Sequence, residues 1–481
     1  MLVALLPLSV PAAIAPAKAG PAGSPSLRLV AADRTLTLDR RGDSIRLALG
    51  TYVAATGGDF ELRVARPDYD SPAGVSQVDA QEGEILRTLP SDMLAGWRGL
   101  REFLNVSFTN QKGKVVASKD FTFCPNDWSR QRIDDSGPQV SRYPMFCSSG
   151  LPFLKGMVWG IDDHWATATF GEYQAPPLSV RAGNYTVGVK INEAYRSALD
   201  ISDADGALTL EIKVRDHHKG ARSSHRLGAE QASPRRRTSP GRHAADDVPT
   251  VTDPDPNTLP DLAALPAWNI YARHRGLKDL LSFASTLVNS GPAPLVVEGF
   301  RRADQDTMDA YQYFHNSADE VVGRAPAGTI DFDTRHGHHH WHFRQFVSYT
   351  LLDASGQNVV RSMKQSFCLA PTDPFDLTAP GAEWSPWEVG LQSACGGPEA
   401  LWIREHLDAG WGDTYFQNVA GQAFNITRVP NGWYYVRVKV NPIGALHETT
   451  SANNSEMRLV RLTGKPGDRR ALVAPWHGIE A

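Results

Sequence analysis

Arg335-His-Gly-His-His-His-Trp-His-Phe343 is the most distinctive stretch of this sequence. Five of its nine residues are histidine, out of 15 in the whole chain. Neutral imidazole is the commonest metal ligand in proteins and suits copper, zinc, iron and nickel. His338, His340 and His342 alternate, and on an extended strand such residues project from one face. The alternation therefore predicts that these three imidazoles converge on one metal ion.

The spacing of these histidines also predicts an irregular backbone. An ideal strand would place the Cα atoms of His338 and His342 roughly 13 Å apart, which is long for two ligands of one ion, so we expect a bend or bulge here. His336 and His339 are expected to point elsewhere. A solvated polar loop is the alternative, but interleaved Trp341 and Phe343 speak against it. The motif does not separate copper from zinc.

Composition indicates an ordinary soluble, multidomain chain. A length of 481 residues is typical of two or three domains. The net charge of −4 at pH 7 gives no sign of nucleic-acid binding. Residues 1–19 are apolar and end in the cleavage-like Ala17-Lys18-Ala19, which predicts a secretory signal without its basic region, a disordered apolar tail being the alternative. No later stretch is long and apolar enough to span a bilayer.

The four cysteines fall into two local pairs, Cys124 with Cys147 and Cys368 with Cys395. An even number, paired within each half, is typical of an oxidising compartment, so we predict two disulfides. Free buried thiols are the alternative. Together with the signal-like start, the cysteines favour a secreted, extracellular protein.

Alternating apolar and polar residues predict a mainly β protein made of two antiparallel, sandwich-like domains. Between them lies a stretch without apolar periodicity that contains Arg235-Arg-Arg237, which indicates a flexible linker. The only predicted helix lies around Leu401 to Leu407. We therefore predict a signal-like segment at 1–19, an N-terminal β domain at 27–215, a linker at 216–257, a C-terminal β domain at 258–465 and a tail at 466–481.

The two halves resemble each other in sequence. Residues 101–124 parallel residues 344–368, and Ala182-Gly-Asn-Tyr-Thr-Val-Gly-Val-Lys-Ile-Asn192 parallels Asn431-Gly-Trp-Tyr-Tyr-Val-Arg-Val-Lys-Val-Asn441. We interpret this as an internal duplication, with convergent β patterning as the alternative. The N-terminal copy has no histidines before Arg101, so any metal chemistry is expected in the C-terminal half alone. The N-terminal half is then a metal-free scaffold or docking module.

Around the histidines, the C-terminal half resembles the catalytic domain of the lysyl oxidases, which are copper amine oxidases. His338-His-His340-Trp-His342 is similar to that family's copper motif. Lys364-Gln-Ser-Phe-Cys368-Leu, Asp413-Thr-Tyr415 and Val440-Asn-Pro442 follow in the family's order. The resemblance covers about residues 259–464, under half of the chain.

The resemblance implies a specific activity and cofactor. Copper would be held by His338, His340 and His342, and Lys364 and Tyr415 would crosslink to form lysine tyrosylquinone. The reaction would oxidise a primary amine, such as the ε-amine of a lysine side chain or a small amine, with O₂, giving an aldehyde, ammonia and hydrogen peroxide. Such electron-sink chemistry belongs to the cofactor, while the protein supplies position and polarity. Taken singly, Lys364 and Tyr415 would be an ordinary surface lysine and core tyrosine.

The resemblance further implies a structural calcium, whose oxygen ligands suit that ion. Its ligands would be Asp261, Leu262 through its carbonyl, Glu448, Asn453 and Asn454. Thr450 replaces one acid of the family pattern, so a weak or empty site is the alternative.

The sequence also departs from the animal enzymes. The acid and the further histidine that follow the copper motif there are absent from residues 343–348, so no base for proton abstraction can be named. This half has only the cysteine pair Cys368 and Cys395, whereas animal catalytic domains have several more disulfides. An apparent insertion lies within residues 371–386, where it could border the entrance.

Two functions of other classes compete with a secreted amine oxidase. One is a non-catalytic extracellular metal-binding or adhesion protein that keeps the fold and the histidines. The other is a zinc hydrolase using three histidines and water, although the chain has no H-E-x-x-H pattern.

Overall fold

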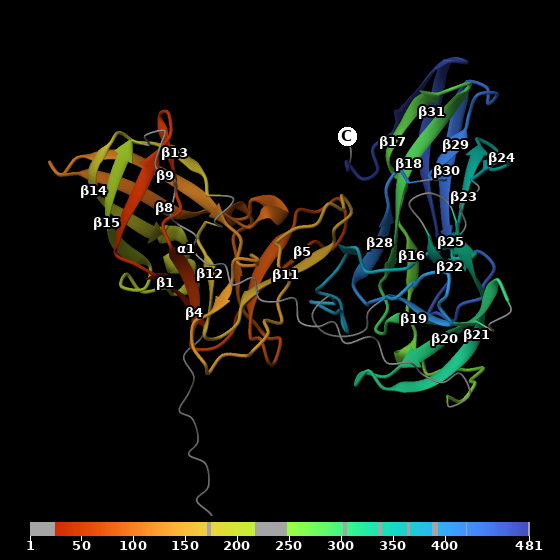
Figure 1. The fold of residues 1–481 in the computed structure, drawn as a ribbon, viewed down its shortest axis with the longest axis horizontal. Coiled ribbons are helices and arrows are strands. Elements are labelled where there is room, and N and C mark those ends of the chain that lie inside the picture. Colours follow the sequence, from red (N-terminus) through yellow and green to blue (C-terminus); the bar gives the residue numbers. More distant parts are fainter. Residues whose placement is uncertain are drawn as a thin grey trace, which may run out of the picture.

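The computed structural model describes residues 25–170, 175–216, 248–301, 305–334, 339–362, 366–386, 393–419 and 421–479. Within them the protein is mainly β, with several antiparallel sheets, as the alternating sequence predicts. Figure 1 shows the N-terminal strands gathered in one part of the molecule and the C-terminal strands in the other. None of the helices in the described part combines the length and apolar character that crossing a bilayer requires.

The N-terminal half contains a five-stranded sheet and three smaller ones. The five-stranded sheet has the order β2 (Thr35–Arg40), β15 (Ala207–Asp216), β14 (Gly183–Ile191), β8 (Leu100–Asn110) and β9 (Val115–Phe123). Two four-stranded sheets follow the orders β1 (Ser26–Ala31), β4 (Thr51–Thr56), β12 (Trp165–Ala168), β10 (Gln131–Arg132), and β11 (Gly156–Ile161), β5 (Phe60–Ala65), β6 (Gly74–Val78), β7 (Ile85–Leu89). The remaining elements are the pair β13 (Pro177–Ser179) and β3 (Ser44–Arg46), the 3-10 turns η1 (Ser91–Met93) and η2 (Gly96–Arg98), and the helix α1 (Glu193–Leu199).

The C-terminal half is built from three larger sheets. One has the order β16 (Leu262–Ala264), β18 (Lys278–Asn289), β28 (Trp411–Tyr415) and β26 (Asp373–Pro374), with β17 (Trp268–Arg275) and β29 (Ala423–Asn425) also paired to β18. The second has the order β25 (Ser366–Phe367), β22 (His340–Arg344), β21 (Val321–Asp333), β20 (Thr307–His315), β19 (Leu295–Arg301) and β27 (Trp402–Leu407). The third has the order β24 (Asn358–Arg361), β23 (Val347–Asp353), β30 (Gly432–Val440), β31 (Ser455–Lys465) and β32 (Asp468–Val473), and η3 (Pro256–Thr258) precedes the first sheet in the chain.

Alternation in the sequence becomes alternation in burial. In β14 the side chains of Tyr185, Val187, Val189 and Ile191 are buried, while the residues between them are more exposed. Residues two apart share one face of a strand, so a period of two lets one face pack on the core. In the C-terminal half, Phe283 of β18 contacts Tyr349 of β23, with ring centroids 5.1 Å apart. Two sheets therefore pack face to face there.

The predicted helix around Leu401 to Leu407 is wrong, because residues 402–407 form β27, an edge strand paired with β19. Five of its six residues are buried, including Arg404, Glu405 and His406. Charged residues on a buried strand break the usual alternation, so local periodicity did not indicate a strand. Each finds a partner in the folded protein: Arg404 forms an ion pair with Glu298 at 2.6 Å, for example.

Both predicted disulfides are confirmed. Cys124–Cys147 and Cys368–Cys395 have Cα separations of 5.8 and 6.0 Å, within the range a disulfide allows. The first follows β9 directly, and the second follows β25 directly.

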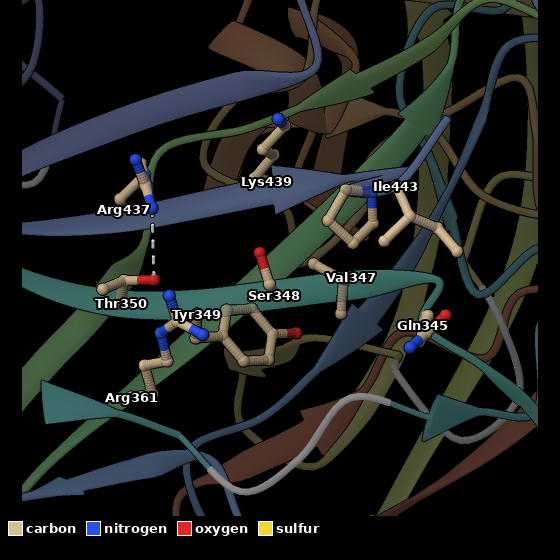
Figure 2. A pocket seen from close by; sticks show the side chains of 10 residues that line it. Gln345, Val347, Ser348, Tyr349, Thr350, Arg361, Arg437, Lys439 and Ile443 are labelled. Atoms are coloured by element: carbon tan, nitrogen blue, oxygen red, sulfur yellow. Dashed lines mark hydrogen bonds between the residues drawn. The ribbon is translucent and has the colours of Figure 1, made fainter. Parts of the chain in front are cut away.

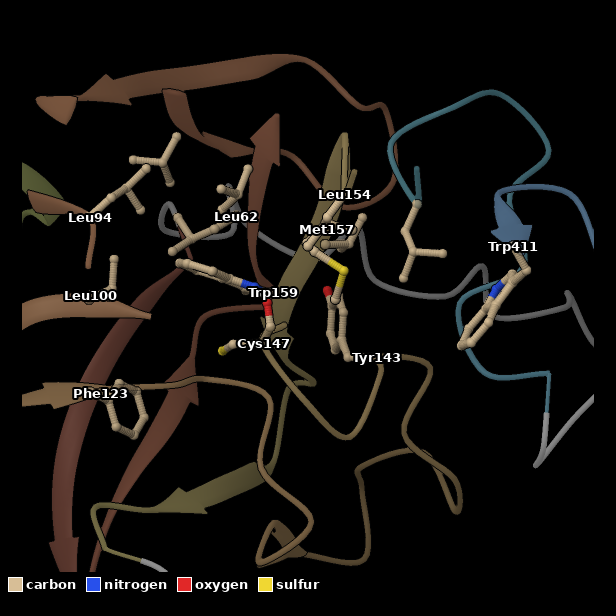
Figure 3. Packing of buried hydrophobic residues seen from close by; sticks show 14 of the residues in the cluster. Leu62, Leu94, Leu100, Phe123, Tyr143, Cys147, Leu154, Met157, Trp159 and Trp411 are labelled. Atoms are coloured by element: carbon tan, nitrogen blue, oxygen red, sulfur yellow. Dashed lines mark hydrogen bonds between the residues drawn. The ribbon is translucent and has the colours of Figure 1, made fainter. Parts of the chain in front are cut away.

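The two halves touch through residues 371–386, the segment predicted to be an insertion. The Lys155 N–H donates to the Phe375 carbonyl at 2.8 Å, and the Leu377 N–H donates to the Gly156 carbonyl at 3.0 Å, which extends the edge of β11. Trp384 stacks on Tyr143 with ring centroids 5.8 Å apart. Figure 3 shows Tyr143 within the buried cluster of the N-terminal half, with Trp411 of the other half nearby.

The predicted domain limits remain predictions, but some elements near them are described. Residues 468–473 form β32, the fifth strand of a sheet, so ordered structure continues past the predicted limit at residue 465. Near the end of the predicted linker, Thr250 forms a bridge with Arg324 of β21. The signal-like segment and most of the linker lie outside the described residues.

Candidate functional site

The last part of the histidine motif, from His340 on, lies in the strand β22, between β21 and β25. His340 and His342 project from the same face, and their ring centroids are 4.6 Å apart. Trp341 and Phe343 alternate with them and are 1% and 2% exposed. Burying two such side chains contributes roughly 1.5–3 kcal/mol each, which holds the strand in place. The alternation thus separates an anchoring face from a face that carries imidazoles.

The backbone departs from a straight strand at the start of the described part of the motif. His339 has φ of 44°, and the regular pairing with β21 begins only at His340. The side chain of His339 is exposed. His336 and His338 lie outside the described residues, so the sharing of one ion by His338, His340 and His342 stays a prediction. Within the described ranges, no three His, Cys, Asp or Glu side chains gather closely enough to hold a metal.

Two polar side chains orient His342, which is 1% exposed. Its Nδ1 lies 3.3 Å from Oδ2 of Asp333 and 3.5 Å from Oγ of Ser366. Carboxylates beside a metal-ligating imidazole fix its ring orientation and tautomer and raise its basicity. Sequence reasoning missed Asp333, although its place shortly before the histidine run on a paired strand could have indicated it.

Tyr415 ends β28 and lies beside the segment that follows Lys364. Its hydroxyl donates to the Cys368 carbonyl at 2.9 Å, and its ring packs edge-on against Phe367 with centroids 4.3 Å apart. Burial raises the pKa of the Tyr415 phenol well above 10, and the nearby carboxylates of Asp413 and Glu405 raise this pKa further. The phenol is therefore protonated at neutral pH. Lys364 lies outside the described residues, so its crosslink with Tyr415 stays a prediction.

Residues 366–368 connect the histidines with the tyrosine. Ser366 contacts His342, Phe367 contacts Tyr415, and the Cys368 carbonyl accepts the Tyr415 hydroxyl proton in a hydrogen bond. The same short segment pairs with the histidine strand, because Phe343 is opposite Phe367. Two motifs far apart in the sequence therefore border one place in the fold.

Glu405 is a buried carboxylate that sequence reasoning did not identify. It is 0% exposed, and its two oxygens accept from the Phe343 N–H at 3.1 Å and the Leu369 N–H at 3.0 Å. Burial raises its pKa well above 4.5, only partly offset by these two hydrogen bonds. Glu405 thus ties the histidine strand to the chain just after Cys368. Its position on β27 was hidden because that stretch was predicted to be helical.

The residues predicted to bind calcium lie together. Nδ2 of Asn453 donates to both carboxylate oxygens of Asp261 at 3.2 Å, and Nδ2 of Asn454 donates to Oε1 of Glu448 at 2.7 Å. The Leu262 N–H donates to Oε2 of Glu448 at 3.3 Å. Burial raises the pKa of Glu448. The Oδ1 atoms of Asn453 and Asn454 are buried without a hydrogen-bond partner. Two carboxylates and two unsatisfied amide oxygens form a donor set that suits Ca²⁺.

The predicted insertion at residues 371–386 pairs with β28, the strand that carries Tyr415. Asp373 and Pro374 pair with Gly412 and Trp411 of β28. The Trp411 indole N–H donates to the Glu383 carbonyl at 2.5 Å. Since the same insertion contacts the N-terminal half, the insertion connects that half to the tyrosine strand. Its predicted place at the site entrance remains a prediction.

Comparison with known proteins shows what the sequence of the C-terminal half is similar to. Residues 314–468 match the family model described as lysyl oxidase. Lysyl oxidase homolog 4 of Mus musculus is 30% identical over 137 residues, which are 26% of this chain and 16% of that protein. Lysyl oxidase homolog 2 of Gallus gallus is 27% identical over 181 residues, which are 36% of this chain and 19% of that protein.

The matched parts span less than a fifth of those relatives. The family match starts in β20, includes the histidine strand and Tyr415, and ends at the start of β32. The C-terminal region of this chain, residues 314–468, is therefore a lysyl oxidase family domain with distant relatives among the lysyl oxidase homologs.

Proposed function

We propose that the C-terminal half is an exported, copper-dependent amine oxidase that oxidises primary amines, most suitably lysine ε-amines, to aldehydes. The observation that carries this proposal is the placement of residues 366–368, which contact His342 on one side and Tyr415 on the other. Family membership implies amine oxidase chemistry, and the two disulfides suit an oxidising compartment.

The residues present fit the copper and quinone that this function needs. His338, His340 and His342 would hold copper, and imidazoles suit Cu²⁺, which leads the divalent affinity order. Lys364 and Tyr415 would supply the lysine tyrosylquinone. When bound, copper supplies the redox chemistry with O₂ that phenol oxidation requires, which zinc lacks. Asp333 and Ser366 orient the imidazole of His342, and Glu405 fixes the strand behind it.

The protein also controls protons around Tyr415. The raised pKa of the phenol keeps its proton on the hydroxyl, which donates to the Cys368 carbonyl. Asp413 is 2% exposed and lies two residues before Tyr415 on β28, on the same face. Its carboxylate raises the pKa of the Tyr415 phenol. We assign Asp413 as the carboxylate that accepts a proton in this site, a role that no residue in 343–348 can fill.

The test of this function compares copper-loaded wild type with Tyr415→Phe and Lys364→Ala. We expect the wild type to stain as a quinoprotein, to release hydrogen peroxide from a primary amine, and to yield a crosslinked peptide joining Lys364 and Tyr415. Both variants should bind copper but lose the stain, the peptide and the activity. Amine oxidase activity that persists in either variant, or without the crosslinked peptide, would contradict the assignment.

A separate experiment tests Asp413. Asp413→Asn should bind copper normally and form the quinone stain, while its kcat for amine oxidation falls by about 10²–10⁴-fold because a proton acceptor is lost. A normal kcat and an unchanged pH profile would remove Asp413 from this role.

We further propose that Asp261, Leu262, Glu448, Asn453 and Asn454 hold a structural Ca²⁺. The buried Oδ1 atoms of Asn453 and Asn454, which lack hydrogen-bond partners, support this. The ion would join the start of β16 to the loop between β30 and β31. Calcium at about 100 times its Kd should stabilise the fold by about 2.7 kcal/mol, seen as a higher Tm that EGTA reverses. Asp261→Asn should remove the calcium-dependent rise, and an equal rise in that variant would refute the site.

A further inference from the structure

We propose that the outward face of β23, β24 and β30 is a binding groove for an acidic, extended polypeptide segment. A hollow of about 320 Å³ lies on this face, and its lining includes three cationic side chains, Arg361, Arg437 and Lys439. Figure 2 shows them around the hollow, with Ser348 and Thr350 on the strand between. Arg361 comes from β24, and Arg437 and Lys439 come from β30. The fold thus brings cations from strands far apart in the sequence to one place.

The register of the sheet sets the positions of these cations. Thr350 of β23 is opposite both Arg437 of β30 and Arg361 of β24, and Ser348 is opposite Lys439. Arg437 donates to the Thr350 hydroxyl over 3.5 Å, a weak hydrogen bond, and its Nε is buried without a hydrogen-bond partner. None of the three forms an ion pair with a carboxylate of any residue the structure describes. Like charges this close favour a ligand that supplies negative charge.

The geometry suits an extended peptide with acidic residues at alternate positions. Arg437 and Lys439 are two residues apart on one strand, which is about 6.8 Å, and alternate side chains of an extended peptide repeat at the same distance. Arginine and lysine bind carboxylates through charge-assisted hydrogen bonds. At one end of the groove lie Pro442 and Ile443, and Ile443 is 61% exposed, which offers a contact for an apolar side chain.

The same end of the groove lies near the histidine strand in the chain. Gln345, which lines the hollow, is in the turn between β22 and β23, three residues after His342. If the proposed amine oxidase function holds, on which this step rests, the segment in the groove would be the acidic neighbourhood of a substrate lysine. The groove would then select peptide amines over small amines through their flanking carboxylates.

The N-terminal half shows that the fold does not require these cations. Its sheet has the same pairing, with Ser107 opposite both Gly188 and Ser118, and Asn105 opposite Lys190. The positions of Arg437 and Arg361 are thus held by Gly188 and Ser118, and only Lys439 has a cationic counterpart, Lys190. The cationic groove is therefore a property of the lysyl oxidase half.

The test measures binding of a labelled, lysine-free peptide of alternating glutamate and serine to the full-length, copper-free protein by fluorescence anisotropy at low salt. A peptide of the same length with alternating glutamine and serine is the uncharged control. We expect the glutamate peptide to bind at least about tenfold more tightly, and Arg437→Gln to weaken it by about tenfold, the effect of a charge-assisted hydrogen bond. The triple change of Arg361, Arg437 and Lys439 to Gln should abolish binding, whereas Lys190→Gln should bind like wild type.

Equal affinity for both peptides, or unchanged affinity in the triple variant, would overturn the proposal that this groove binds an acidic peptide. Binding of a sulfated polysaccharide without binding of the glutamate peptide would overturn the assignment of a polypeptide. Because the peptide carries no lysine and the protein carries no copper, these binding results do not depend on the oxidase chemistry. In the copper-loaded enzyme, Arg437→Gln should raise KM for a glutamate-flanked lysine peptide by about tenfold and leave kcat/KM for a small amine unchanged; an unchanged peptide KM would remove the substrate role.

Discussion

The five-stranded sheets of the two halves share their pairing but differ in the side chains around it. β9, β8, β14 and β15 follow one another in the same order as β24, β23, β30 and β31. Asn105 is opposite Lys190 in one sheet, and Ser348 is opposite Lys439 in the other. The fifth strands differ, since β2 runs parallel to β15 and β32 runs antiparallel to β31. The four strands with shared order thus gain a fifth strand from before them in the sequence in the N-terminal half (β2), and from after them in the C-terminal half (β32).

Details of the backbone agree as well. The hairpins between β8 and β9 and between β23 and β24 turn at Gly113 and Gly356, with φ of 74° and 79°. The hydroxyls of Tyr185 and Tyr434 each donate to the carbonyl four residues earlier, at 3.0 and 2.9 Å. These agreements support our proposal of an internal duplication, because convergent β patterning gives no reason for matched turns and tyrosines.

The two halves differ in the residues that directly precede this shared sheet. In the C-terminal half the histidine strand precedes β23. In the N-terminal half β8 follows Gly99, where an added Cβ would lie 2.3 Å from the Phe123 carbonyl oxygen. A side chain does not fit there without a backbone shift. The N-terminal half therefore lacks not only the histidines but also room for a side chain directly before its sheet.

The largest expected effect separates the two faces of the histidine motif. His342→Asn should lower copper content and reduce amine oxidation by more than about 100-fold, since changes to the partners of metal ligands already cost 10–100-fold. His339→Asn, at an exposed position of the same motif, should stay within a few-fold of wild type. Copper analysis and peroxide release measure both, and a comparable loss in the two variants would remove the assignment of a metal-binding face.

The two disulfides should stabilise similarly but differ in their effect on activity. Their sequence separations are 23 and 27, so replacing either pair by serine should cost about 3 kcal/mol in the free energy of unfolding. Only the loss of Cys368–Cys395 should also impair amine oxidation, because the Cys368 carbonyl accepts from Tyr415. Urea unfolding and activity assays distinguish the two. If loss of Cys124–Cys147 impairs activity equally in the folded protein, the halves are more coupled than we propose.

Glu405 should give the C-terminal half a pH dependence. Its raised pKa means that the folded state keeps a proton that the unfolded state releases above about pH 4.5. The free energy of unfolding should therefore fall as the pH rises from there through the raised pKa. Glu405→Gln should flatten this fall, because the side chain no longer titrates. It should also cost about 1–3 kcal/mol at acidic pH, because the one oxygen of the glutamine amide leaves one of the two backbone N–H groups unsatisfied. Urea unfolding from pH 4.5 to 8 measures both, and parallel profiles would contradict the prediction.

The smallest effect tests the duplication itself. Tyr185→Phe and Tyr434→Phe each remove one hydroxyl with the same geometry, so each should cost about 1 kcal/mol. The changes in urea midpoint should be similar. A loss of several kcal/mol in one variant with none in the other would show that the two hydrogen bonds contribute unequally to stability despite their matched geometry.

Several features were predictable because they depend on neighbours in the sequence. The period-two alternation predicted a mainly β protein, and strands such as β14 and β30 show it because one face of each packs on a core. Cysteines spaced within each half predicted both disulfides. The alternating histidines predicted the shared face of His340 and His342, which the structure shows for these two residues.

Local pattern determined the mainly β character, the disulfides and the face that carries the histidines, whereas contacts across the sheets decided how the site is supported. Glu405 bonds Phe343 across 62 positions, and Ser385 contacts Tyr143 across 242. The cationic groove forms only when β24, β23 and β30 come into register. The physical reason is that periodicity shows which face of an element is buried, but not which other element covers it. Buried ionisable residues such as Glu405 disturb that periodicity, because their partners come from other strands.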